Sequence, residues 1–374
     1  MGRDCAEEID FVRKPATGFA ARDKGWDMTK RQAFEIAGDV VLAGTRRTVN
    51  IPVSTLSDHT PVTLSAHVVH GKKDGPVVFV SAGIHGDEVI GVEIVRRLLR
   101  AKNLAKLSGT LIVVPIVNTF GFLNHSRYLP DRRDLNRCFP GSPHGSLASR
   151  LADIFMTEIV ERSTLGIDLH SAAVHRVNLP QVRVSASNRA TLGLAEVFGA
   201  PVILTSALRE GSLRQEAKKK GVDVLLYEAG EGMRFDEMSV RAGLAGILRV
   251  LNSVGLLPSA GIAKPKAKSL LCSDSHWLRA PAGGLLRAFK AEGDVVSEGD
   301  VVAAISDPFG EREIEVTTKY GGIIVGRAVM PVVHEGDALF HIADVKSNDV
   351  AEAAVDDLNT QLEEASLFDE DEII

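Results

Sequence analysis

The stretch SAGIHGDEVIG, residues 81–91, joins a predicted strand to a predicted helix and decides the fold class. The run before it, GPVVFVSAG (75–83), is short and apolar, which is typical of a strand buried on both faces. The run after it, VIGVEIVRRLLRAK (89–102), places apolar residues on one helical face with arginines opposite. His85 and Glu88 lie three residues apart at this junction, so one imidazole and one carboxylate can face the same cation. The alternative is a first-turn acid favoured by the helix dipole beside an ordinary loop histidine.

Strands and helices alternate outward from this stretch. Further strands are predicted at 110–117, 164–170 and 222–230, and helices at 146–160 and 239–251. Two β-rich runs, 48–56 and 62–71, precede them. The expected fold is therefore an α/β core, a mixed central sheet flanked by helices with some parallel pairing.

After the core the pattern changes to short strands and Gly-Asp turns that form an internal repeat. Residues 283–307 match 321–344 in their paired glycines, their EGD turn and their closing Asp, which predicts a small all-β barrel or sandwich with pseudo-two-fold symmetry. We expect five segments: an N-terminal extension (1–44), a catalytic α/β domain (45–258), a linker (259–274), the β-barrel domain (275–345) and an acidic tail (346–374).

Charge is distributed unevenly along the 374 residues. The net charge is −6, but the segment 346–374 holds ten acids against one lysine, so residues 1–345 carry +3. No apolar run reaches the roughly 18 residues that a membrane helix needs, and the amino terminus lacks signal-peptide character. Three widely spaced cysteines argue against a disulfide framework. We expect a cytoplasmic protein without membrane or nucleic-acid partners.

A third metal ligand is predicted at the end of the strand TLGIDLH (164–170). His170 follows an apolar run, at the edge where open α/β sheets place their ligands. Two histidines and one glutamate form a known catalytic zinc set that leaves one position for water. His175 is the rival, and His170 is favoured because Asp168 and Ser171 could orient it.

Two further segments carry candidate catalytic side chains. The loop NHSRYLPDRRDLNRCFPG (124–141) is rich in arginine, and guanidinium groups can dock a carboxylate or polarise a carbonyl. Arg132 and Arg133 have a second interpretation, a solvated loop paired with its own aspartates. In LLYEAGEG (225–232) an apolar strand delivers Glu228, a candidate general base, with Glu231 as its alternative.

Four motifs in this order, GIHGDE, RYLPDRRDLNRCFPG, DLH and YEAGE, resemble the succinylglutamate desuccinylase/aspartoacylase family, within the zinc carboxypeptidase-like superfamily. The resemblance implies one zinc ion per chain. It also implies the following roles: His85, Glu88 and His170 bind the metal, Arg127 polarises the scissile carbonyl, Asn136 and Arg137 hold a substrate carboxylate, and Glu228 activates the water. Arg132 competes with Arg127 for its role, and Arg214 is a further substrate arginine if GSLRQEA aligns with the family.

The function implied is hydrolysis of the amide bond in a small, carboxylate-bearing N-acylated amino acid or related compound. The alternatives are a carboxypeptidase-like enzyme acting on short peptides and a noncatalytic binding or carrier protein. The carrier alternative arises because the repeat region resembles biotinyl/lipoyl-type domains. In those domains a hairpin carries the modified lysine, but the corresponding hairpin here reads SDPFGERE and has no lysine. Lys319 is displaced from that position. A homo-oligomer is compatible with the sequence. Opposite charge suggests that the tail covers the arginine-lined mouth.

Overall fold

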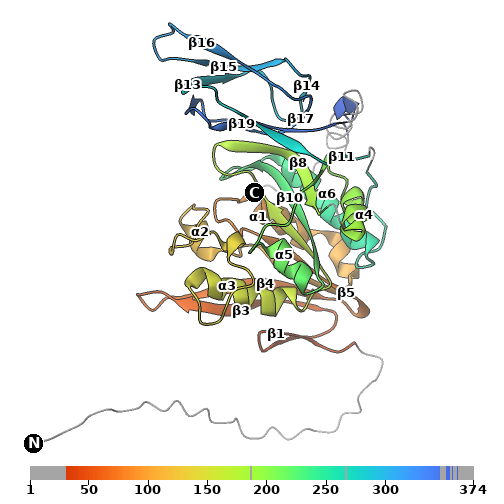
Figure 1. The fold of residues 1–374 in the computed structure, drawn as a ribbon. Coiled ribbons are helices and arrows are strands. Elements are labelled where there is room, and N and C mark those ends of the chain that lie inside the picture. The colour runs from red at the N-terminus through yellow and green to blue at the C-terminus, as the bar shows by residue number, and fades with distance from the viewer. Residues whose placement is uncertain are drawn as a thin grey trace, which may run out of the picture. The chain divides into compact units, whose positions relative to one another are not determined.

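The computed structural model describes residues 31–185, 188–265, 268–345, 351–353, 356 and 360. One mixed sheet runs through this part of the chain in the order β12-β19-β17-β8-β10-β7-β5-β6-β4-β3, and β9, β11 and β14 pair beside it (Figure 1). Its strands in the α/β part are β3 (Thr45–Thr55), β4 (Pro61–His70), β5 (Lys73–Ala82), β6 (Ser108–Val114), β7 (Leu165–His170), β8 (Arg176–Val184), β9 (Val202–Thr205), β10 (Asp223–Glu231) and β11 (Leu270–Cys272).

The centre of this sheet is parallel. β5 pairs in parallel with β6 and β7, and β7 pairs in parallel with β10. Residues 78–82 of β5 are fully buried, as expected of a strand covered by helices on both faces. The predicted mixed α/β sheet is therefore confirmed.

Helices cover both faces of the sheet (Figure 1). One face packs against α1 (Ile90–Arg100), α4 (Arg189–Phe198) and α6 (Glu237–Ser253). The other packs against α2 (Thr119–Leu123), α3 (Leu147–Phe155) and α5 (Leu213–Lys219). Three short helical turns complete this part, namely η1 (Lys102–Lys106), η2 (Leu135–Arg137) and η3 (Met156–Val160). In α1, Ile90, Ile94 and Leu98 are buried in the core, while Arg96 and Arg100 are exposed. This is the amphipathic pattern that the sequence predicts.

The C-terminal region is all β, as predicted. A four-stranded antiparallel sheet, in the order β16-β15-β13-β18, shares an apolar core with strands of the main sheet, including Val302, Phe340 and Ile342. The strands are β12 (Ser275–Arg279), β13 (Gly284–Ala288), β14 (Val295–Val296), β15 (Val301–Ser306), β16 (Glu313–Thr317), β17 (Gly322–Ala328), β18 (Val332–Val333) and β19 (Ala338–Ala343). β17 pairs antiparallel with β8, so the main sheet continues from the α/β part into this region without a break.

Some elements lie where the sequence predicted no regular structure. β1 (Phe34–Ile36) and β2 (Asp39–Val41) pair within the segment assigned to the N-terminal extension. β11 lies within the segment assigned to the linker and pairs with β9. Most of the acidic tail, and with it the hypothesis that it covers the mouth, lies outside the described residues. Among the helices described, none has the length and apolar character to span a bilayer.

Candidate active site

The turn after β5 brings His85 and Glu88 to the carboxyl end of the central strands. Gly83 adopts φ +65°, a conformation that glycine reaches without strain. Gly86 packs against the backbone of Gly121, where an added Cβ would lie 1.9 Å from the carbonyl carbon. Any other residue would push the turn away from α2, so the two glycines fix the direction in which His85 and Glu88 point.

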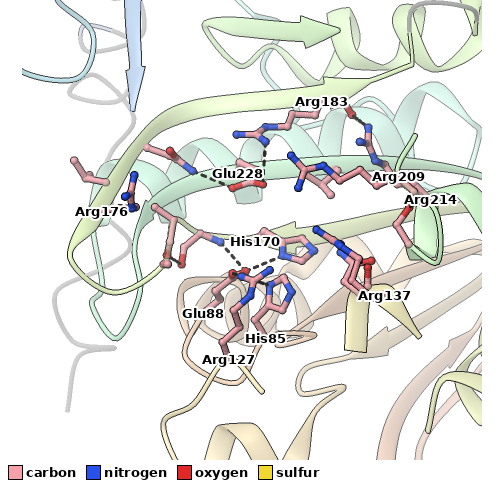
Figure 2. Close-up of a pocket in the computed structure, with 18 of the residues that line it drawn as sticks. His85, Glu88, Arg127, Arg137, His170, Arg176, Arg183, Arg209, Arg214 and Glu228 are labelled. Atoms are coloured by element: carbon pink, nitrogen blue, oxygen red, sulfur yellow. Dashed lines mark hydrogen bonds and ion pairs between the residues drawn. The ribbon is translucent and has the colours of Figure 1, made fainter. Parts of the chain in front are cut away.

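His85, Glu88 and His170 converge on one point (Figure 2). The Nδ1 atom of His85 lies 2.7 Å from Oε1 of Glu88, and Nδ1 of His170 lies 2.7 Å from Oε2 of the same carboxylate. All three side chains are buried. One ligand atom from each lies within 4.8 Å of the others. The sequence proposed these three as ligands, and they form a compact set of two imidazoles and one carboxylate.

The far side of each imidazole is held by another carboxylate. Nε2 of His170 contacts Asp168 at 2.8 Å, and Nε2 of His85 contacts Asp134 at 3.1 Å. Asp168 in turn accepts a hydrogen bond of 2.7 Å from the Ser81 hydroxyl. Metal-binding histidines commonly donate their second N–H to a carboxylate, which leaves the other nitrogen free to coordinate. The donor set therefore fits a single divalent metal ion.

The charges in this cluster depend on one another. Burial by itself raises the pKa of the Glu88 carboxyl, but the facing imidazoles of His85 and His170 outweigh it and hold the pKa below its usual range. Burial likewise opposes ionisation of Asp134, whereas His85 and Arg127 lower its pKa. Both carboxylates are thus kept ionised, the state that metal coordination and imidazole orientation require.

Arg127 is the arginine of the 124–141 loop that reaches this cluster. Its guanidinium donates to Glu88 Oε1 at 3.3 Å and to Asp134 Oδ2 at 2.9 Å. Arg132 is exposed, adopts φ +61°, and is not among the residues that line the pocket. Of the two arginines that the sequence left open, Arg127 therefore has the geometry for a role in the site.

A cavity of about 230 Å³ opens over the metal-ligand set. The arginines that line it are Arg127, Arg137, Arg176, Arg183, Arg209, Arg214 and Arg327, against two carboxylates, Glu88 and Glu228. Asn136 also lines the cavity, and its amide oxygen accepts a hydrogen bond from the Leu213 N–H at 2.9 Å. Burial, and then the cation of Arg183, lower the pKa of Arg214 to about 10. The cavity thus combines one metal-ligand set with a large excess of positive charge.

Glu228 lies directly beside His170, because the two are register partners on β10 and β7. One of its oxygens accepts a hydrogen bond from Asn178 Nδ2 at 2.9 Å, and the other lies 3.7 Å from Arg183 Nη1. Glu231, the alternative base, is engaged elsewhere by the His175 N–H at 3.1 Å and by Arg234 at 3.1 Å. Neither Glu231 nor His175 lines the cavity.

The sequence did not assign several residues that the structure brings to the site. Asp134 was seen only as part of a charged loop. Asn178 and Arg183 belong to β8, a strand that the sequence did not predict, although the alternation in RVNLPQVRV is a strand signal. Trp277 and Arg327 belong to the C-terminal region and lie roughly 100 residues or more beyond β8 in the sequence. No local pattern connects that region to the cavity.

This fold, with two histidines and a glutamate under an arginine-rich cavity, defines the class of metal-dependent amide hydrolases. The family model of the succinylglutamate desuccinylase/aspartoacylase catalytic domain matches residues 74–254. The chain belongs to this family, and it is a deacylase with a single metal site.

Individual relatives are similar to this chain in sequence or in fold. The N-alpha-acetyl-L-2,4-diaminobutyric acid deacetylase of Halomonas elongata is 27% identical over 312 residues, which are 79% of this chain and 90% of that protein. A succinylglutamate desuccinylase/aspartoacylase structure from Rhodobacter sphaeroides has a TM-score of 0.73 at 25% identity, covering 87% of this chain and 99% of that chain. The ectoine utilization protein EutE (DoeB) from Ruegeria pomeroyi has a TM-score of 0.72 at 23% identity, covering 80% and 94%.

Proposed function

We propose that this protein is a zinc-dependent deacylase that hydrolyses the amide bond of a small N-acyl amino acid bearing more than one acidic group. The observation that carries the proposal is the buried His85, Glu88 and His170 set, which lies at the base of a cavity lined by seven arginines. The metal-ligand set supports amide hydrolysis, and the arginines support an anionic substrate.

The chain's own residues would divide the chemistry as follows. Zinc held by His85, Glu88 and His170 would act as a Lewis acid and lower the pKa of a bound water to roughly 7. Glu228, the register partner of His170, would accept a proton from the attacking water and return it to the departing amine. Arg127 would donate to the carbonyl oxygen as negative charge develops there. Asn136 and Arg137 would hold the carboxylate of the amino acid.

Arg214 would provide a second anion contact. Among the described residues no carboxylate forms an ion pair with Arg137, Arg209 or Arg214, although all three line the cavity (Figure 2). Arg137 and Arg209 are exposed, but Arg214 is half-buried. A half-buried guanidinium without a counter-ion is costly, and a bound anion would offset that cost at Arg214. The Halomonas relative acts, by its name, on an acetylated diamino acid. The cationic side chain of such a substrate would meet positive charge here, so we favour an acidic side chain or an acidic acyl group.

A carboxypeptidase-like activity on short peptides is the alternative. The cavity volume of about 230 Å³ suits a compact substrate better than a chain. Release of free amine separates the candidates. We expect N-acetyl-aspartate, N-acetyl-glutamate or N-succinyl-glutamate to exceed N-acetyl-diaminobutyrate and dipeptides in kcat/KM by about tenfold or more. Preference for the diaminobutyrate compound or for a peptide would reject the proposed substrate class.

The metal and the base are tested by two sets of variants. The protein should hold about one zinc per chain, and the double change of His85 and His170 to Ala should abolish metal binding. Glu228→Gln should keep the zinc and lose most turnover, by about 10³-fold or more, because the amide cannot accept the proton. Full metal retention in the double variant would reject the ligand set, and an active Glu228→Gln would move the base elsewhere.

A further inference from the structure

The two oxygens of Glu228 are each connected to strand β17 of the C-terminal region. Oε2 accepts from Asn178 Nδ2 at 2.9 Å, and Asn178 is the register partner of Gly326 on β17. Oε1 faces Arg183, whose Nε donates to Gln181 Oε1 at 3.4 Å. Gln181 in turn donates from Nε2 to the backbone oxygen of Val325, also on β17, at 2.9 Å. Two separate chains of contacts thus lead from one short segment of β17 to one carboxylate.

Gly326 is the point at which β17 leaves room for Asn178. A Cβ built on Gly326 would lie 2.5 Å from Asn178 Oδ1 and 3.1 Å from the Val177 oxygen. Gly326 has no positive φ, so the backbone conformation does not require glycine there. Glycine is needed for space instead, because any side chain at position 326 would fill the room that Asn178 Oδ1 occupies. Because Asn178 Oδ1 occupies that space, its Nδ2 is turned toward Glu228. This orientation is the one in which the amide can donate to a carboxylate, since a carboxylate only accepts.

We propose that β17 fixes the position of the general base, with Asn178 as a positioning residue and Gly326 as the residue that gives it space. The C-terminal region then takes part in catalysis by orienting Glu228 across the continuous sheet. A carboxylate that accepts an amide hydrogen bond on one oxygen loses rotational freedom and presents its other oxygen to the site. A misplacement of about 1 Å in such a group costs about 10²-fold in rate.

Four variants test this positioning role in the zinc-loaded full chain, using the N-acyl amino acid with the highest kcat/KM in the panel above. Asn178→Ala removes the hydrogen bond, which should lower kcat by about tenfold to a hundredfold with KM changed less than about threefold. Gly326→Ala should have a similar effect by displacing Asn178. The double variant should match Asn178→Ala alone, because without the amide the new methyl group has nothing to displace.

Asn178→Asp tests the donating amide itself. It keeps the shape of the side chain but replaces the amide with a carboxylate, and a normal kcat in this variant would reject the positioning role. Positioning predicts a loss larger than that of Asn178→Ala, because two carboxylates would then face each other at pH 8. Gly321→Ala is the matched control, since a Cβ there would meet its nearest atom at an ordinary 3.5 Å, and it should leave kcat within about twofold.

A crystal structure of the Gly326→Ala variant gives a readout independent of turnover, namely rotation of the Asn178 amide away from Glu228. The inference rests on Glu228 being the base, and the two can fail separately. An active Glu228→Gln rejects the proposed base. An inactive Glu228→Gln together with normal kcat in Asn178→Ala and Gly326→Ala rejects the positioning role. Additive losses in the double variant also reject it, because the two residues would then act independently.

Discussion

Asp134 links the metal-ligand set to the arginine loop. One of its oxygens holds His85 Nε2, and the other accepts from Arg127 at 2.9 Å. The same residue begins the turn η2, where its side chain accepts from the Asn136 N–H at 2.9 Å. A single carboxylate therefore orients an imidazole, a guanidinium and the turn that carries the proposed substrate amide.

Asp134→Asn should weaken metal binding by about 10- to 100-fold, because the His85 imidazole loses its anionic partner. Zinc affinity measured by competition with a chromogenic chelator checks this. Asp153→Asn on α3 is a suitable control, since Asp153 does not line the cavity. Equal zinc affinity in the Asp134→Asn variant and the unaltered protein would show that the contact does not support the metal site.

Arg214 allows the charge argument to be tested at one residue. Arg214→Met should raise KM for a substrate with two acidic groups by about tenfold or more, since a charge-assisted contact is lost. It should change KM little for N-acetyl-alanine, which carries only one carboxylate. The exposed Arg132→Gln serves as the control for a general loss of positive charge. An equal rise in KM for both substrates would mean that Arg214 contributes only to the overall potential of the cavity.

At the level of the elements, the sequence predicted those with a strong internal pattern. β5, α1 and β7 follow from apolar runs and helical spacing, and their ends deliver His85, Glu88 and His170. β8 was not predicted, although Asn178 and Arg183, which line the cavity, stand in a run where polar and apolar residues largely alternate. Contacts between elements far apart in the sequence, such as Gly326 with Asn178, depend on register that no local pattern contains.

Strands β12 and β19 carry a stack that should respond to pH. Trp277 lies parallel to His341 at a centroid distance of 4.3 Å, and the Arg176 guanidinium lies 5.6 Å from the Trp277 ring. Burial, helped by the positive charge of Arg183, lowers the pKa of His341 to about 3. Between pH 6.5 and 3 the unfolded chain therefore binds a proton at this histidine that the folded chain does not, so stability falls as pH falls.

Lowering the pH from 6.5 to 5 should cost about 2 kcal/mol at this one group. Urea unfolding followed by tryptophan fluorescence measures it. His341→Phe keeps an aromatic ring against Trp277 but cannot titrate, so its unfolding free energy should depend less on pH over this range. Exposed His334→Gln in the same region is the control. An unchanged pH slope in the His341→Phe variant would assign the acid sensitivity to other groups.

At the scale of the whole molecule, the α/β part and the C-terminal region share one sheet. β17 covers the edge of β8 with a ladder that includes residues 326–328, and β8 separates it from β10, which carries Glu228. Leu179 of β8 and Val202 of β9 pack in one core with Ile323 and Val325 of β17. The repeat region therefore completes the catalytic sheet, and its removal would expose both an apolar core and an unpaired strand edge.

A chain that ends after residue 274 should consequently lose more than the C-terminal strands. We expect it to aggregate, or to melt at least about 10 °C lower than the full chain, because the edge of β8 and the core around Leu179 become exposed. Gel filtration and a thermal melt measure this. A chain that ends at residue 356 keeps every strand from β12 to β19 and also Ala351, which is buried in the same core as Leu179, and should stay monodisperse with its zinc bound. A stable, zinc-binding 1–274 fragment would contradict the shared sheet as a requirement for folding, and normal turnover by that fragment would also show that β17 is not needed to position Glu228.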